Sequence, residues 1–215
     1  MKTHTKESQA AITPAIALDI LKDGNQRFVN NLKANRNLLQ QANETSDGQH
    51  PFAVILSCID SRTSAELIFD QGLGDVFSIR IAGNIINEDI LGSMEFGCKV
   101  AGAKIIVVLG HTNCGAVKGA CDNFKMGNLT NLLSKIKLAV DDEKTVIDNR
   151  NSDNENFVEN VATINVKRTV KAIMEQSPIL KEMLESGAIG IVGGSHDIGT
   201  GKVEFYLETM IILVR

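Results

Sequence analysis

The chain has 215 residues, of which 43% are hydrophobic, and a formal net charge of −4 at pH 7. This composition can bury one substantial core, so we expect a single domain over residues 1–215 that includes a helical N-terminal arm over residues 1–50. No cluster of Lys or Arg forms the positive surface that binds nucleic acid or anionic membranes. We therefore expect no nucleic-acid partner and a small-molecule substrate.

The chain also lacks the signals of membrane insertion and of disulfide-rich secreted proteins. No apolar run reaches the roughly 18 residues that span a bilayer, and the first residues lack the apolar block of a secretory signal. We expect no membrane partner and a cytoplasmic location, although a signal peptide already removed would leave no trace here. Four cysteines are too few for a disulfide framework. Cys98 and Cys121 are interpreted as plain buried or half-buried thiols.

The first predicted element is an amphipathic helix over residues 14–34. Thr13 supplies a capping hydroxyl, and Pro14 suits the first helical position. Four apolar residues then share one face of this helix: Leu18, Leu21, Phe28 and Leu32. Because this face must be covered, we expect the helix to pack on the chain's own core or on a second subunit.

Strands and helices are then expected to alternate. Two short apolar runs, residues 52–57 and 105–109, indicate central parallel strands covered on both faces. Further strands are predicted at 76–81 and 188–192, an edge strand or hairpin at 203–214, and helices at 64–69, 88–101, 114–123 and 158–186. The Asp-, Asn- and Glu-rich residues 141–156 are expected to form a solvated loop or a frayed helix end. The pattern predicts an α/β fold with a central, mostly parallel β-sheet flanked by helices.

Two cysteines and a histidine follow the two central strands. Cys58 comes directly after the first strand, His111 follows the second, and Cys114 lies three residues further on. The carboxyl ends of parallel strands meet at one edge of a sheet, and two residues three apart at a helix start share one face. Two thiolates and one imidazole, with a position left for water, are typical of catalytic zinc. Iron and cobalt remain compatible with these residue types.

A carboxylate and a guanidinium lie in the same segment as Cys58. Asp60 and Arg62 are two residues apart, so in an extended segment they point the same way and form an ion pair that keeps Asp60 ionised. Such a carboxylate can accept a hydrogen bond from metal-bound hydroxide and fix its orientation. Asp60 and Arg62 are therefore candidate catalytic residues. The alternative is an ordinary exposed ion pair, which contributes little.

These motifs resemble the β-class carbonic anhydrases, which carry Cys-x-Asp-x-Arg after the first strand and His-x-x-Cys after a later one. The likeness extends through residues 24–28, 80–84, 91–96, 110–115 and 197–201 and so covers nearly the whole chain. The resemblance implies a zinc lyase, with one Zn²⁺ per subunit, that interconverts carbon dioxide and bicarbonate by metal-bound hydroxide. It also implies a homodimer or a dimer of dimers, with the active site at the subunit interface.

The resemblance also assigns a substrate pocket. Four residues match it by position: Gln49, Phe77, Ala82 and Phe96. The glutamine would donate a hydrogen bond to bicarbonate, and the apolar side chains would admit carbon dioxide, with core packing as the alternative for the two phenylalanines. At low pH, Asp60 would become a fourth metal ligand. A second, inhibitory bicarbonate pocket of some relatives is matched only in Arg80, since the chain has no tryptophan, so an open resting site is expected at mildly alkaline pH.

Two positions depart from the family pattern. Ile81 stands where a polar residue is usual, and His196 stands where tyrosine is common. We expect His196 to be a surface or turn residue, with a proton relay as the alternative. Relatives that act on carbonyl sulfide or carbon disulfide share the same motifs, so these substrates remain open. A hydrolase using a Cys-His pair is less favoured, and a zinc dehydrogenase is disfavoured because no Gly-x-Gly-x-x-Gly follows a strand.

Overall fold

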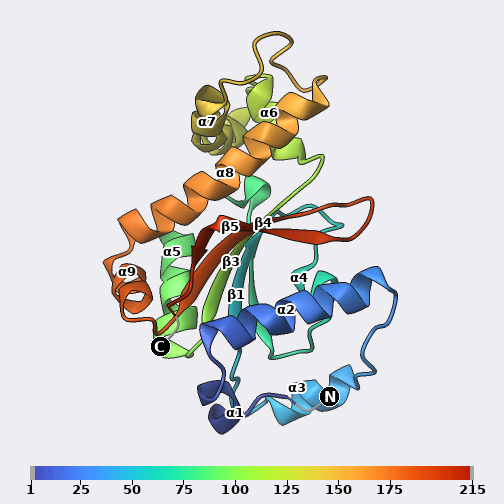
Figure 1. The fold of residues 1–215 in the computed structure, drawn as a ribbon, viewed down its shortest axis with the longest axis vertical. Coiled ribbons are helices and arrows are strands. Elements are labelled where there is room, and N and C mark those ends of the chain that lie inside the picture. Colours follow the sequence, from blue (N-terminus) through green and yellow to red (C-terminus); the bar gives the residue numbers. More distant parts are fainter. Residues whose placement is uncertain (1–2, 214–215) are drawn as a thin grey trace.

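The computed structural model describes residues 3–213, in which a five-stranded sheet carries helices on both faces (Figure 1). The strands are β1 (Ala53–Ser57), β2 (Val76–Arg80), β3 (Ile105–His111), β4 (Gly190–His196) and β5 (Val203–Ile211). Their order across the sheet is β2-β1-β3-β4-β5. The first four strands run parallel, and β5 pairs antiparallel with β4. The predicted α/β class is confirmed.

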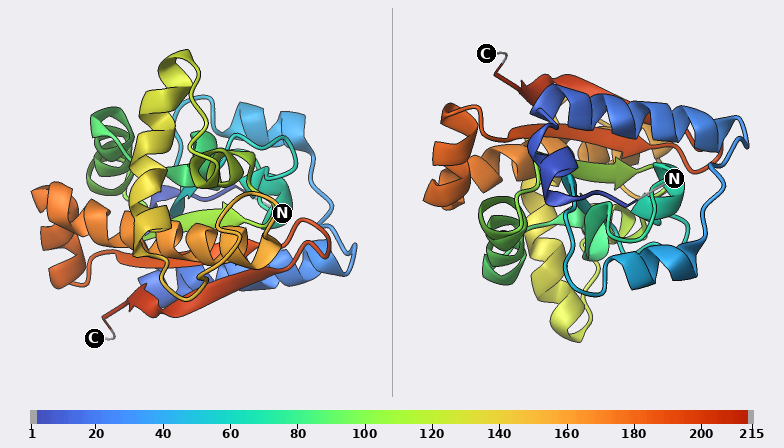
Figure 2. Two further views of the ribbon diagram at one scale, coloured as in Figure 1. Left: turned by 90° about the horizontal axis from the view of Figure 1, so that it is seen from above. Right: turned by 90° about the horizontal axis from the view of Figure 1, so that it is seen from below.

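The helices divide between the two faces of the sheet, with α2 on one side and α8 on the other (Figure 2). Their bounds are α1 (Lys6–Ala10), α2 (Pro14–Val29), α3 (Leu38–Glu44), α4 (Ala65–Ile68), α5 (Glu88–Glu95), α6 (Gly115–Cys121), α7 (Gly127–Asp142), α8 (Glu155–Gln176) and α9 (Pro178–Glu185). A 3-10 turn, η1 (Ala82–Asn84), follows β2, and a π-helical turn, η2 (Phe96–Val100), ends α5.

β1 and β3 form the centre of the sheet, and every residue of both strands is buried. Side chains alternate between the faces, so Ile55 and Val107 pack with α2 and α4, whereas Val54 and Ile106 pack with α5, α8 and α9. Burial on both faces explains why these segments are continuously apolar. A third cluster joins α6, α7 and α8 beyond the carboxyl ends of the strands, where Figure 1 shows them gathered at one end of the molecule.

Two predicted helices differ from the observed ones in extent. The helix expected over residues 14–34 ends at Val29, because Asn31 adopts a left-handed conformation with φ of 54°. The helix expected over residues 158–186 is two helices, α8 and α9. The break falls at Ser177, whose hydroxyl accepts a hydrogen bond from the Leu180 backbone amide and caps α9.

The segment from residue 127 to 154 contains an unpredicted helix and a folded loop. α7 was not predicted, and its last turn takes up the start of the expected solvated loop. The next residue, Glu143, is only 1% exposed. Its carboxylate accepts hydrogen bonds from the backbone amides of Thr145 and Val146 and pairs with Arg150 at 2.8 Å. The segment therefore begins at the end of a helix, which is one of the two expected forms, but the expected solvation was wrong at Glu143.

The two ends of the described chain add short elements. α1 and α3 accompany α2 in the N-terminal arm. β5 forms an edge strand, as predicted, although Val214 of the predicted range lies outside the described residues. Across residues 3–213, no helix combines the length and apolar character needed to cross a membrane.

Candidate metal centre

Three buried potential ligands converge where β1 and β3 end. Cys58 follows β1, His111 is the last residue of β3, and Cys114 directly precedes α6. The two sulfur atoms are 4.0 Å apart, and one ligand atom from each of the three residues lies within 4.8 Å of the others. Within residues 3–213, no other group of three His, Cys, Asp or Glu side chains gathers in this way. The predicted convergence at the carboxyl edge of the sheet is present.

The backbone brings His111 and Cys114 together by a turn. Asn113 has a φ of 57°, in the left-handed region, and Cys114 is the N-cap residue of α6 in an extended conformation. The expectation that the pair shares a helical face was therefore wrong. The left-handed residue reverses the chain after β3, and this reversal returns the Cys114 sulfur to the end of the strand.

The donor set fits a zinc ion. His111 Nδ1 lies 2.9 Å from the carbonyl oxygen of Thr112, which can only accept, so Nδ1 carries the proton and Nε2 keeps its lone pair. His111 Nε2 is buried without a hydrogen-bond partner. Tetrahedral zinc, with bonds of about 2.3 Å to sulfur, sets two sulfurs about 3.8 Å apart. The spacing of the Cys58 and Cys114 sulfurs is close to this value.

Neighbouring donors favour the thiolate form of Cys58. Hydrogen bonds from the Cys114 thiol and then from the Gly83 backbone amide lower the pKa of Cys58 to about 4, although burial opposes this. The amide nitrogen of Gly83 is 3.4 Å from the Cys58 sulfur. The hydrogen bond that Cys114 donates to the Cys58 sulfur, together with burial, raises the pKa of Cys114. A metal cation takes the place of that proton when it binds both sulfurs.

Asp60 is paired with Arg62. Arg62 Nε and Nη2 donate to the two carboxylate oxygens at 3.0 and 2.9 Å, and the Arg62 backbone amide donates to Oδ1 at 2.9 Å. These hydrogen bonds from the Arg62 side chain hold the pKa of Asp60 well below its usual range. The segment is a turn and is not extended as expected, because the Thr63 amide donates to the Asp60 carbonyl at 3.0 Å. Asp60 is outside the cluster of ligand atoms, so its role as a low-pH ligand stays a prediction.

Arg80 supports the same segment in a way that the sequence analysis missed. Its Nε donates to the Cys58 carbonyl at 3.0 Å, and its Nη2 donates to the Asp60 carbonyl at 2.6 Å. Arg80 ends β2, beside the end of β1. Its position in the family-like segment 80–84 was the available signal, but it did not indicate which backbone atoms the guanidinium would hold.

The four predicted pocket residues are not brought together in one chain. Ala82 begins η1, next to the Gly83 amide that contacts Cys58. Gln49 is exposed in the loop before β1, so about 17 Å of strand separates its end of β1 from Cys58. The rings of Phe77 and Phe96 meet edge to face, 6.3 Å apart. They line a groove beside α5 that includes none of the metal ligands.

His196 is buried, contrary to the expectation of a surface or turn residue. It is 3% exposed at the end of β4 and stands opposite His111 in the sheet register. Burial, followed by the neighbouring His111, lowers the pKa of His196 to about 4, so its ring is neutral near pH 7. Neither ring nitrogen has a hydrogen-bond partner among the described residues. The glycine-rich sequence around it concealed a strand.

Comparison with known proteins agrees with this site. A family model described as carbonic anhydrase matches residues 53–203. The chain is 36% identical over 196 residues to "Carbonic anhydrase 2" of Mycobacterium tuberculosis, covering 88% of this chain and 91% of that protein. It is 35% identical over 193 residues to a carbonic anhydrase of Mycolicibacterium smegmatis, covering 89% and 92%.

Solved structures agree as well. The β-carbonic anhydrase CcaA superposes with a TM-score of 0.70 at 25% identity, over 92% of each chain. A structure from a study of two tetrameric β-carbonic anhydrases of Sordaria macrospora has a TM-score of 0.67 at 25% identity, over 76% of this chain and 84% of that one. The fold and the buried Cys-His-Cys cluster are those of a β-class zinc lyase. The chain belongs to the carbonic anhydrase family, and the predicted family and enzyme class are confirmed.

Proposed function

We propose that the carbonic anhydrase activity of this chain resides at a zinc ion held by Cys58, His111 and Cys114. The observation that carries this proposal is that two sulfurs and one ring nitrogen of His111 lie within 4.8 Å of one another. His111 Nε2 is in addition buried without a hydrogen-bond partner. Three protein ligands leave the fourth tetrahedral position for water, as catalytic zinc requires. Asp60 and Arg62 stand beside the cluster as the proposed catalytic pair.

The charge of the ligands is expected to set how the reaction depends on pH. A zinc ion bound there would lower the pKa of a coordinated water from about 15.7 toward about 7 and so supply the nucleophile for carbon dioxide. Because Cys58 and Cys114 bind as thiolates, they cancel the formal charge of the ion. This water is therefore less acidic than one held by three neutral histidines, and activity is expected to rise with pH.

Asp60 is proposed to orient the nucleophile. Arg62 keeps the carboxylate ionised, so Asp60 can only accept hydrogen bonds. The side chain and backbone amide of Arg62 occupy three of the roughly four lone-pair sites of the carboxylate and leave one on Oδ2 free. An oxygen with one proton that donates to Asp60 has its own lone pair directed away from the carboxylate, toward the carbon that it attacks. A freely rotating carboxylate would not fix that direction.

We further propose that a second copy of the chain completes the substrate pocket. Gln49, Phe77 and Phe96 lie away from the metal ligands of their own chain, and the Phe96 side chain is 53% exposed. In a homodimer, or a dimer of dimers, these residues can line the partner's site. There the phenylalanines would form an apolar wall for carbon dioxide and Gln49 would donate to bicarbonate. The name of one structural neighbour describes it as tetrameric.

A cytoplasmic location is also proposed. All four cysteines are free thiols in the structure, and two of them are needed as metal thiolates. A reducing compartment keeps such cysteines from forming a disulfide. Fractionation of cells that produce the protein tests this location directly.

The proposed activity is tested by stopped-flow hydration of carbon dioxide, with the zinc content measured on the same sample. We expect one zinc per chain, activity that disappears with the metal on chelation, and recovery when zinc is restored. Carbonyl sulfide and carbon disulfide are assayed in parallel. Hydration that survives removal of the metal contradicts the zinc site, and faster turnover of either sulfur compound contradicts the assigned substrate.

A further inference from the structure

A short turn behind Cys58 has an unusual backbone. In η1, Gly83 and Asn84 both have positive φ, at 68° and 42°. The Gly83 amide donates to the Cys58 sulfur. The turn is tightly packed, because a Cβ added to Gly83 would lie 2.4 Å from Ile136 of α7. The direction of this amide therefore depends on what holds the turn.

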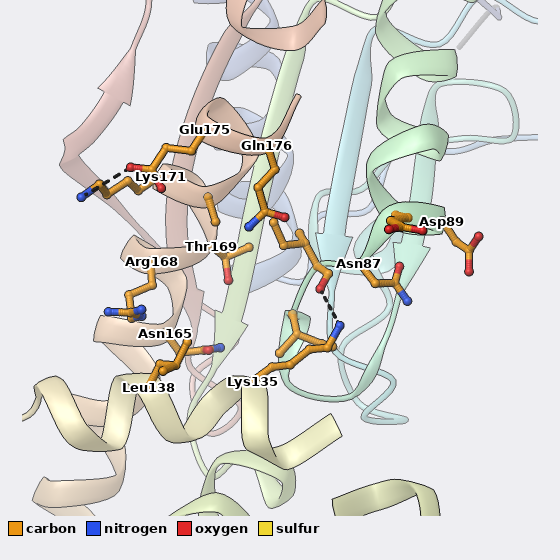
Figure 3. Close-up of a pocket in the computed structure, with 14 residues that line it drawn as sticks. Asn87, Asp89, Lys135, Leu138, Asn165, Arg168, Thr169, Lys171, Glu175 and Gln176 are labelled. Carbon is orange, nitrogen blue, oxygen red and sulfur yellow. Dashed lines mark hydrogen bonds and ion pairs between the residues drawn. The ribbon is translucent and has the colours of Figure 1, made fainter. Parts of the chain in front are cut away.

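Two polar side chains of α8 hold the turn by hydrogen bonds to its carbonyls. Asn165 Nδ2 donates to the Gly83 carbonyl at 2.8 Å, and the Thr169 hydroxyl donates to the Asn84 carbonyl at 3.4 Å. The two residues are four positions apart and share one face of the helix. Both side chains line a groove of about 710 Å³ between α5, α7 and α8, and both are labelled in Figure 3.

Packing alone does not explain these two residues. Asn165 is 4% and Thr169 is 5% exposed, although the neighbouring buried positions of α8, such as Val166 and Val170, are apolar. A buried polar side chain is costly unless it is hydrogen-bonded. Here each one satisfies a carbonyl of a left-handed turn that has no helix or sheet ladder to supply a donor. A hydrogen-bonded connection thus runs from Asn165 to the Gly83 carbonyl, across the Gly83 Cα to its amide, and on to the Cys58 sulfur.

We propose that Asn165, supported by Thr169, is a positioning residue that aims the Gly83 amide at the Cys58 sulfur and so tunes the metal centre. This inference rests on the zinc site proposed above. Asn165 does not belong to the ligand cluster and acts through the backbone conformation of Gly83, whose carbonyl it holds and whose amide contacts Cys58. An amide donor draws charge from a thiolate, so its loss alters both metal affinity and the electronic character of the sulfur–metal bond.

The test measures metal binding by purified variants. Asn165→Asp keeps the size of the side chain and exchanges the donor for a carboxylate, Asn165→Ala removes the whole group, and Thr169→Val removes only the hydroxyl. Ile173→Val is the control, because Ile173 is also buried on α8 but packs against the sheet in the cluster that contains Val54 and Ile106. Zinc affinity is measured by competition with a chromophoric chelator. The sulfur-to-cobalt charge-transfer band is recorded after Co²⁺ loading, and circular dichroism and thermal unfolding show which variants are folded.

Both Asn165 variants are expected to bind zinc roughly tenfold to a hundredfold more weakly and to shift the charge-transfer band. Thr169→Val should show a smaller change in the same direction, and Ile173→Val should match the parent in affinity and spectrum. Folded Asn165 and Thr169 variants with parental affinity and spectrum would overturn the inference, as would an equal loss in the control. Failure of the parent chain itself to bind zinc would instead overturn the zinc site proposed above.

Discussion

The metal ligands and the predicted pocket residues are organised in opposite ways. Cys58, His111 and Cys114 are buried together at the carboxyl ends of two adjacent central strands. Gln49 and Phe96 are exposed and lie at other places on the chain. One chain is therefore sufficient to assemble the metal ligands, whereas the proposed pocket is not assembled within one chain. Metal content and turnover should consequently respond to different substitutions.

The largest effect is expected from removing a ligand. Cys114→Ser should lower the zinc content from one per chain to near zero and abolish zinc-dependent turnover, since the remaining Cys58 and His111 hold the ion weakly. Zinc is measured by atomic absorption and turnover by stopped-flow hydration. The matched control is Cys98→Ala, which removes another buried thiol whose pKa burial raises to about 12. Full zinc content in Cys114→Ser would remove this residue from the ligand set.

A smaller loss is expected when the ligands are kept and the carboxylate is neutralised. Asp60→Asn should retain one zinc per chain and lose turnover by roughly 10²-fold, because an amide can donate as well as accept and no longer fixes the direction of the nucleophile. The measurement is the hydration rate between pH 7 and 9 with zinc content on the same sample. Asp141→Asn, on the exposed end of α7, is the control. A parental rate across this pH range would refute the orienting role.

The pocket is tested by a substitution that should not affect metal binding. Phe96→Ser is expected to leave zinc content unchanged and to raise KM for carbon dioxide by roughly tenfold, because it removes an apolar wall. Phe124→Ser is the matched control, since Phe124 has a similar exposed fraction, 50% against 53%, and lies outside the groove. Sedimentation of both variants checks the oligomeric state. Equal kinetics for the two variants would contradict a pocket role for Phe96.

The smallest effect concerns a region that belongs to neither set. Burial alone would raise the pKa of Glu143, but hydrogen bonds from the Thr145 hydroxyl, two backbone amides and Arg150 lower it from 4.5 to about 2. The stabilisation from this group is complete above pH 4.5 and is lost as the pH falls through about 2. Glu143→Gln should therefore lower the free energy of unfolding by about 1–3 kcal/mol at pH 6.

Urea unfolding at pH 6, 4 and 3 measures this difference, which should narrow as the pH falls. Zinc content at pH 7 should equal that of the parent, since Glu143 is in the loop after α7. A constant difference at all three pH values would show that the carboxylate charge is not the source of the stabilisation. This result would leave the contrast between metal ligands and pocket unchanged.

The parts of the site that could be predicted are those that depend on a residue's position next to a strand in the sequence. Cys58 and His111 each follow a buried apolar strand, so the order of elements alone predicts their meeting at one edge of the sheet. Their spacing does not encode the backbone path, and the turn at Asn113 was consequently mistaken for a helical face. Hydrogen bonds across long sequence separations were beyond reach as well, since Asn165 and its partner Gly83 are 82 positions apart.

Burial was the other quantity that local patterns predicted poorly. His196 follows glycines, which usually indicate turns, but these glycines lie within β4 and pair with β3. α7 begins at a glycine without a side-chain cap, so it lacks the usual start signal. β4 and α7 can be recognised only from the elements that pack against them, and the sequence does not show this packing. The strands β1 and β2 were accordingly predicted with the least error, whereas the long α8 was merged with α9.

The absence of side chains at two strand positions sets the thickness of the layer between sheet and helix. A Cβ at Gly110 of β3 or at Gly193 of β4 would lie 2.7 Å from Val166 of α8. One extra methyl at either position would have to push the helix outward, and Asn165 would move with it. Under the positioning role proposed for Asn165, the reactivity of the cation site depends on the spacing of this packed layer, so a substitution that touches no ligand can change catalysis by moving a helix.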